Sequence, residues 1–136
     1  MLFRRLGGLT VALVLAGSTL SAQTGPAAPA APNAQLSALI ADLKAPAPSN
    51  RNAAAYEIAG LGPAAAAAVP ALIEALDDEV AAVRFPVTVA LGEIGPAAAA
   101  AVPRLKQMME EDLNDEVAAG AKRAIRHIRP QALSQE

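Results

Sequence analysis

Few residues in this chain of 136 could carry out acid–base or nucleophilic chemistry. There is one histidine, His127, and no cysteine. A metal site needs several ligands and a nucleophile needs an oriented base, and the sequence places no partner of either kind beside His127. We therefore interpret His127 as a surface residue on the flank of a helix, and predict no catalytic site, no metal and no cofactor.

Two acidic clusters are the only other candidate ligands for a cation. One is 77–79 and the other is 110–112 with Asp115 and Glu116. Both lack the alternating oxygen ligands and the central glycine of a dedicated calcium loop. We expect them to be solvated corners between helices, where carboxylates favour the positive end of the following helix dipole.

Basic residues near the C-terminus are a stronger candidate. Lys122, Arg126 and Arg129 recur at i, i+4 and i+7, and Arg123 lies beside them. One interpretation is a solvated face whose cations complement the C-terminus of a helix. The other is a surface that docks an anionic partner.

Aromatic residues are scarce, and after removal of the first 22 residues only Tyr56 and Phe85 remain. Neither falls on a predicted core stripe. Exposed aromatics are frequent anchors of binding surfaces, but each could instead cover a seam between helices.

These candidates depend on a repeat for their positions. GPAAAAAVP occurs at 62–70 and again 33 residues later at 95–103. A period of this length is typical of stacked supersecondary units. Aligning the sequence with itself at this period gives three helix–turn–helix units, at about 34–62, 63–95 and 96–129.

Each unit contains an apolar stripe with helical spacing. We expect Asn33 to cap the first helix, Gly60 and Gly62 to close the second, and a kink at Pro86 unless its helix starts just before it. Gly120 lies inside the last helix and costs about 1 kcal/mol relative to alanine, so we expect that helix to be the loosest. The stripes of the second and third units are Val69, Leu72, Ile73, Leu76; Val83, Val87, Ala90, Leu91, Ile94; Val102, Leu105, Met109; and Val117, Ala121, Ala124, Ile125, Ile128.

The N-terminus resembles an export signal. Arg4 and Arg5 precede an apolar run at 6–16 that is too short to span a membrane comfortably, and small residues end at Ala22. We predict a signal peptide at 1–22 cleaved after Ala22, a Pro/Ala-rich disordered linker at 23–33 and a repeat domain at 34–136. An uncleaved N-terminal anchor is the alternative.

Cleavage would leave nine basic against thirteen acidic residues, a net charge of −4. This acidic balance argues against nucleic acid as a partner. We expect a secreted or periplasmic protein with no membrane span after cleavage.

The segments GPAAAAAVPALIEALDDEVAAVR and VALGEIGP, with IGPAAAAAVPRL and AIRHI, resemble the short bacterial HEAT-like repeats also found in phycobilin lyases. The resemblance covers 34–129. It implies an all-α fold, a right-handed alpha-alpha superhelix of the armadillo type whose second helices line the concave surface. It says little about activity.

The same resemblance implies a structural role for Asp and Arg six residues apart, here Asp78 and Arg84. Ala45 stands where Arg51 would find its own Asp, and Ala118 where Asp112 would find its own Arg. We therefore predict a staggered ladder of ion pairs, Arg51 to Asp78 and Arg84 to Asp112.

Taken together, the sequence favours an exported, non-catalytic protein-interaction scaffold that binds through its second-helix face. A phycobilin-lyase-like enzyme or subunit and a purely structural oligomer are the alternatives, and self-association stays open. The identity of a protein partner is not encoded. The candidate binding residues are Arg51, Tyr56, Phe85, Thr88, Lys122 and Arg123.

Overall fold

The computed structural model describes residues 32–134, within the compact unit Pro32–Glu136. The predicted signal peptide and nearly all of the predicted linker lie outside the described residues. The elements, in order, are α2 (Pro32–Asp42), α3 (Pro48–Leu61), the 3₁₀ helix η1 (Gly62–Ala68), α4 (Val69–Ala75), α5 (Ala81–Ile94), η2 (Gly95–Ala101), α6 (Val102–Glu111), α7 (Asp115–Ile128) and η3 (Pro130–Leu133).

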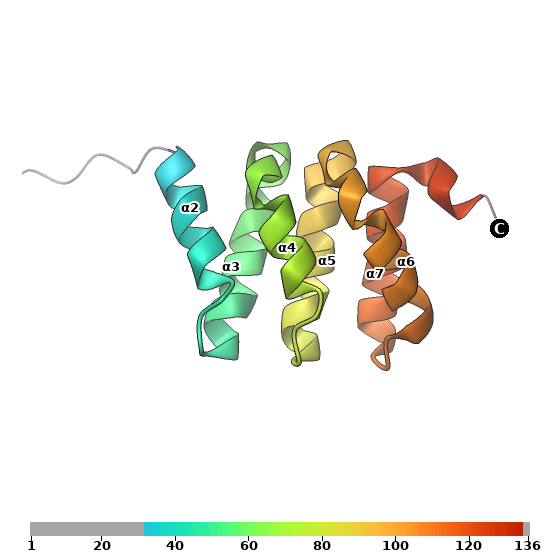
Figure 1. The fold of residues 1–136 in the computed structure, drawn as a ribbon, viewed down its shortest axis with the longest axis horizontal. Coiled ribbons are helices and arrows are strands. Elements are labelled where there is room, and N and C mark those ends of the chain that lie inside the picture. Colours follow the sequence, from blue (N-terminus) through green and yellow to red (C-terminus); the bar gives the residue numbers. More distant parts are fainter. Residues whose placement is uncertain (1–31, 135–136) are drawn as a thin grey trace, which may run out of the picture. The chain divides into compact units, whose positions relative to one another are not determined.

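Two layers of helices build this unit. Figure 1 shows α2, α4 and α6 in front and α3, α5 and α7 behind them. The second helices pack against one another in series, α3 on α5 and α5 on α7, while α2 packs on α3, α4 on α5 and α6 on α7. The all-α repeat architecture expected from the 33-residue period is therefore confirmed.

The core is the seam between the two layers, and it contains the predicted stripes. Leu72, Leu76, Val83, Leu91 and Ile125 are fully buried. Ile73 is only partly buried, and a second predicted position is wrong: Met108 is buried, whereas Met109 is only partly buried. The reason is that α6 continues as a helix to Glu111, whereas α4 ends at Ala75, so the last turn of α6 presents a different residue to the seam.

The alanine-rich 3₁₀ helices η1 and η2, which we call the elbows, pack closely because of their 3₁₀ geometry. A 3₁₀ helix has three residues per turn, so residues at i and i+3 share one face. Ala65 and Ala68 are completely buried in η1, and Ala98 and Ala101 are completely buried in η2. The two elbows also contact each other. The small alanine side chain allows successive repeats to approach closely here.

Glycine is required where α3 meets η1 and where α5 meets η2. Gly62 has φ 57° and ψ −137°, and Gly95 has φ 78° and ψ −143°, a conformation that L-residues with a side chain avoid. The predicted helix end at Gly62 is confirmed, whereas Gly60 lies inside α3 and does not close it. By length and composition, Pro48–Ala75 and Ala81–Glu111 could each cross a membrane, but each is interrupted by one of these glycines and by a 3₁₀ turn, so neither is one straight helix.

Helix starts differ from expectation at two places. Asn33 lies inside α2 and does not cap it, because the helix begins at Pro32. Val80, in extended conformation, precedes α5 without a side-chain cap, so the acids at 77–79 do not cap that helix. Asn114 caps α7 instead, since its side-chain oxygen accepts hydrogen bonds from the N–H groups of Glu116 and Val117.

Pro86 lies inside α5, which begins five residues earlier and continues past it as one helix. A proline in this position removes the hydrogen bond that the carbonyl of Ala82 would accept. The side-chain amide of Asn52, on α3, donates to that carbonyl oxygen instead, at 2.5 Å. The backbone defect therefore becomes a link between neighbouring second helices.

Candidate protein-interaction face

Two repeated ion pairs tie the three repeats together and define which charges are available to a partner. Arg51 donates from Nε and Nη2 to the two carboxylate oxygens of Asp78, at 2.6 and 3.1 Å. Arg84 makes the same two bonds to Asp112, at 2.9 and 3.0 Å. The staggered ladder predicted from the sequence is confirmed.

Each ladder arginine also holds the corner that precedes its own helix. Nη1 of Arg51 donates to the carbonyls of Ala45 and Pro46, at 2.9 Å each, and Nη1 of Arg84 donates to those of Asp78 and Glu79. All three nitrogens of each guanidinium group therefore donate hydrogen bonds within the chain. Arg51, a candidate binding residue, therefore has a structural contact in place of a free charge.

The ladder carboxylates are nearly buried and remain ionised. The side chains of Asp78 and Asp112 are 9% and 6% exposed. Burial by itself raises the pKa of the Asp78 carboxyl, but the hydrogen bonds from Arg51 and from the Val80 N–H outweigh it, so the pKa is lowered. The pKa of Asp112 is lowered in the same way, with Arg84 and the Asn114 N–H as donors.

A hollow beside the loops that follow α4 and α6 is lined largely by these paired charges. It has a volume of about 320 Å³ and lies among α4, α6 and the two corners. Its wall includes the Arg84–Asp112 pair and Arg104, which is paired with Asp77. Because these polar groups already bind one another, the hollow offers a ligand few unused partners.

The second-helix face has a different character. A shallow groove of about 330 Å³ runs between α3 and α5 and reaches the start of α7. Tyr56 lies on it with 47% of its surface exposed, whereas Phe85 is half-buried against the core. The residues that line the groove are Asn52, Tyr56, Ala81, Ala82, Phe85, Asn114 and Glu116.

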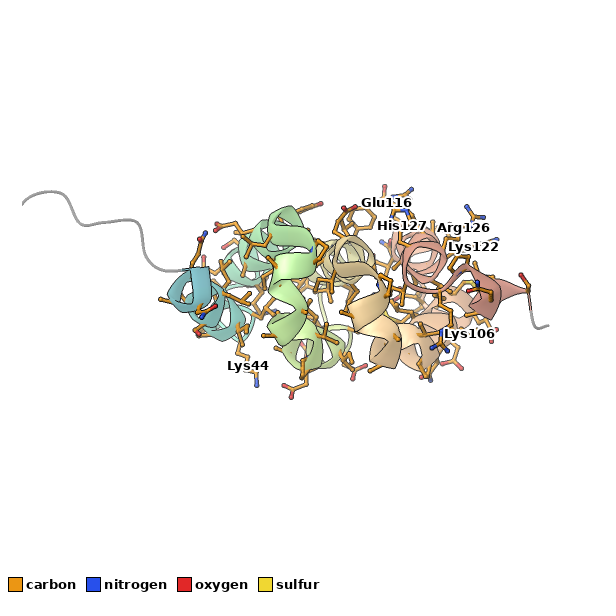
Figure 2. The ribbon with its side chains drawn as sticks, turned by 90° about the horizontal axis from the view of Figure 1, so that it is seen from above. Lys44, Lys106, Glu116, Lys122, Arg126 and His127 are labelled. Carbon is orange, nitrogen blue, oxygen red and sulfur yellow. The ribbon has the colours of Figure 1, made fainter. Side chains whose placement is uncertain are left out.

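A smaller cleft of about 90 Å³ lies between α5 and α7 on the same side. Its lining includes Gly92 and Gly120, with Glu93, Arg123 and His127. All three of these charged or titratable side chains are exposed. Figure 2 shows His127 and Glu116 on one side of the stack, with Lys122 and Arg126 at its C-terminal end.

The structure therefore separates the six candidate binding residues. Tyr56 and Phe85 share the groove, and Arg123 borders the cleft beside it. Lys122 is exposed on α7. Thr88 faces inward: it is fully buried, and its hydroxyl donates to the carbonyl of Phe85 at 2.7 Å, so it offers no surface to a partner.

Sequence reasoning missed why Thr88 is buried. A Cβ built on Gly120 would lie 2.4 Å from Thr88 Oγ1 and 3.3 Å from the Phe85 ring. Gly120 therefore lets α7 approach α5 closely, a packing role that its helix propensity alone does not show; the expectation that α7 is the loosest helix stays a prediction. The signal available in the sequence was the glycine itself, since an interior helix glycine often marks a close packing contact.

Comparison with known proteins agrees with this geometry. The sequence model of the family described as HEAT repeats matches residues 36–126. This chain belongs to the HEAT-repeat family. The match concerns HEAT repeats in general and does not single out the phycobilin-lyase type, and no curated protein matches the chain. HEAT repeats generally mediate protein–protein interaction.

Proposed function

We propose that this HEAT-repeat protein is a non-catalytic scaffold that binds a partner protein through its second-helix face. The observation that supports this proposal is the exposure of Tyr56 on the groove between α3 and α5. Among residues 32–134, the exposed large apolar side chains are Tyr56 and Leu113, and of these Tyr56 lies on a groove between two second helices. A partly exposed aromatic beside a concave surface is a frequent anchor for a partner side chain.

The arrangement supports binding better than it supports catalysis. Among the described residues, no group of three or more His, Asp or Glu side chains could hold a metal ion. The polar groups of the corner hollow are paired with each other, and His127 lies exposed on the edge of a cleft of only about 90 Å³. No observation favours a lyase-type activity.

Replacing Tyr56 with alanine tests this role. We expect at least about a tenfold loss of affinity for the partner, the loss usual for an aromatic anchor, with the helical circular dichroism signal unchanged because Tyr56 lies outside the core. The partner would be obtained with a photo-crosslinking residue at Ala82 in the groove, and its affinity measured with purified proteins.

Leu113→Ala is the matched control, since Leu113 is fully exposed but lies in the corner between α6 and α7. A crosslinking residue at Ser37, on the exposed side of α2, reports contacts of the other layer. If Tyr56→Ala binds as tightly as the parent, or if crosslinks form only from Ser37, the second-helix face is not the binding face.

We also propose that the chain is exported and that its mature form begins at Gln23. This rests on the sequence alone: Arg4 and Arg5, the apolar run 6–16 and the small residues before Gln23. We expect mass spectrometry of the native protein to find Gln23 as the first residue, in the fraction outside the cytoplasmic membrane. Native protein that retains residues 1–22 in the cytosol would contradict export.

A further inference from the structure

Apart from Lys106, the cations among residues 32–134 fall into two groups that differ in their partners. Lys44, Arg51, Arg84 and Arg104 each form a salt bridge with an acid of the following or preceding repeat. The cations of α7, together with Arg129 directly after it, have no carboxylate within salt-bridge distance among residues 32–134, and all of them are exposed. They are Lys122, Arg123, Arg126 and Arg129, and we call them the α7 cations.

The helix dipole explains only part of this group. Its effect falls off within the last turn of a helix, and α7 ends at Ile128. Arg126 lies in the last turn and Arg129 directly follows the helix, whereas Lys122 and Arg123 lie before the last turn. Residues 117–134 contain no Asp or Glu, so no carboxylate of the same stretch offsets the repulsion among the four like charges.

The dimensions and surroundings of the α7 cations restrict what can bind them. At 1.5 Å per residue, Lys122 to Arg129 spans about 10 Å. Asp115 and Glu116 begin the same helix and would repel a long anionic polymer that continued along it. The apolar face of α7, which includes Val117, Ile125 and Ile128, is buried in the core and is not available to a lipid bilayer.

The α7 cations are also continuous with the proposed binding face. Arg123 lines the cleft between α5 and α7 together with His127 and Glu93. Figure 2 shows His127, Arg126 and Lys122 following one another around α7 from that side toward the end of the stack. A segment bound in the second-helix face can therefore extend onto these charges.

We propose that the α7 cations dock a short acidic segment of the partner protein, a stretch with three or four carboxylates. This proposal rests on the proposed function and specifies the chemistry of the partner. Guanidinium groups bind carboxylates through paired N–H donors, and the spacing of the α7 cations matches the length of a few residues of extended chain.

A fluorescein-labelled hexaglutamate peptide is the probe, with hexaglutamine as the neutral control, and anisotropy gives the affinity at about 50 and 150 mM salt. We expect the Lys122→Gln/Arg126→Gln variant to bind at least about tenfold more weakly than the parent. The matched control is Lys44→Gln/Arg104→Gln, which removes the same charge from the other layer of helices and should bind within about twofold of the parent.

Equal losses in both variants would show a net-charge effect and overturn the proposal. Tighter binding of inorganic polyphosphate, or of vesicles rich in anionic phospholipid, that is lost in Lys122→Gln/Arg126→Gln would assign the surface to another class of partner. A salt-sensitive dimer in sedimentation, abolished by the same variant, would assign it to a second copy. Loss of hexaglutamate binding in Tyr56→Ala is not expected, so failure here is distinguishable from failure of the proposed function.

Discussion

Replacing Gly120 with alanine is expected to destabilise the protein by about 1 to 2 kcal/mol, although alanine is the better helix former. The intrinsic gain is about 1 kcal/mol, but the new Cβ would lie 2.4 Å from Thr88 Oγ1 and 3.3 Å from the Phe85 ring. Thr88 is fully buried, so α5 and α7 must separate. Overpacking of this kind costs about 1 to 3 kcal/mol, and urea unfolding followed by circular dichroism measures the difference.

Two variants test that cause. Gly60 also lies inside a helix and is exposed, and a Cβ added to it would have no atom within 4 Å, so Gly60→Ala should be neutral or stabilising by up to about 1 kcal/mol. Thr88→Ala removes the atom that Gly120→Ala would strike, so the cost of Gly120→Ala should fall in that background. Equal costs in both backgrounds would place the strain elsewhere.

The fold was predictable because the same sequence pattern occurs in successive repeats, so each local prediction is supported at more than one place in the chain. The ten alanines of the two identical elbows specify little by themselves. The 33-residue period that aligns the elbows also aligns Leu72 with Leu105, and both of these leucines are buried. The ladder was predictable for a related reason. Ala45 leaves Arg51 without a partner in its own repeat and Ala118 leaves Asp112 without one, so only the staggered pairing gives both of them a partner.

The features that were not predicted depend on positions at which the repeats differ from one another in residue or in spacing. The spacing changes from 33 to 34 residues between Asp78 and Asp112, and in the longer helix α6 Met108 is buried where the period had pointed to Met109. Likewise Gly120 and Thr88 make a contact between α5 and α7 that the α3–α5 pair does not repeat in sequence. A periodic pattern predicts what the repeats share, and these positions are where they diverge.

The candidate site was predictable only in part, for the same reason. The second-helix positions of Tyr56 and Arg123 follow from register, and both are exposed. Register aligns Thr88 with the fully buried Ala55 and Tyr56 with the partly buried Val89, but it gave no sign that Gly120 lets α7 cover Thr88. It also gave no sign that the amide of Asn52 would satisfy the carbonyl freed by Pro86, since that bond joins two different repeats.

Replacing Asp112 with alanine is expected to be the most destabilising of the changes considered, at about 2 to 3 kcal/mol. It leaves the Nε and Nη2 donors of Arg84 unpaired in a side chain that is only 17% exposed, and removes the acceptor of the Asn114 N–H. Breaking a fully buried pair costs about 3 to 5 kcal/mol, and partial exposure of Arg84 lowers that figure. Denaturant unfolding of the variant measures the loss.

The matched control is Lys44→Ala, because the Lys44–Glu74 pair also joins neighbouring repeats but is 65% and 66% exposed. Its cost should stay below about 0.5 kcal/mol. If Lys44→Ala and Asp112→Ala cost the same, then burial does not set the strength of the ladder.

Low pH should decrease the free energy of unfolding of the unmutated protein, because the same carboxylates become protonated. The pKa values of Asp78 and Asp112 are lowered in the folded protein, so the stability they contribute is complete above the unfolded value of about 3.9. It is lost as pH falls from about 5 through that value toward the folded pKa, because the unfolded chain takes up the protons first. Asp112→Ala should therefore lose less stability than the parent between pH 5 and 3, and parallel pH profiles for the two proteins would show that Asp112 is not held ionised by Arg84.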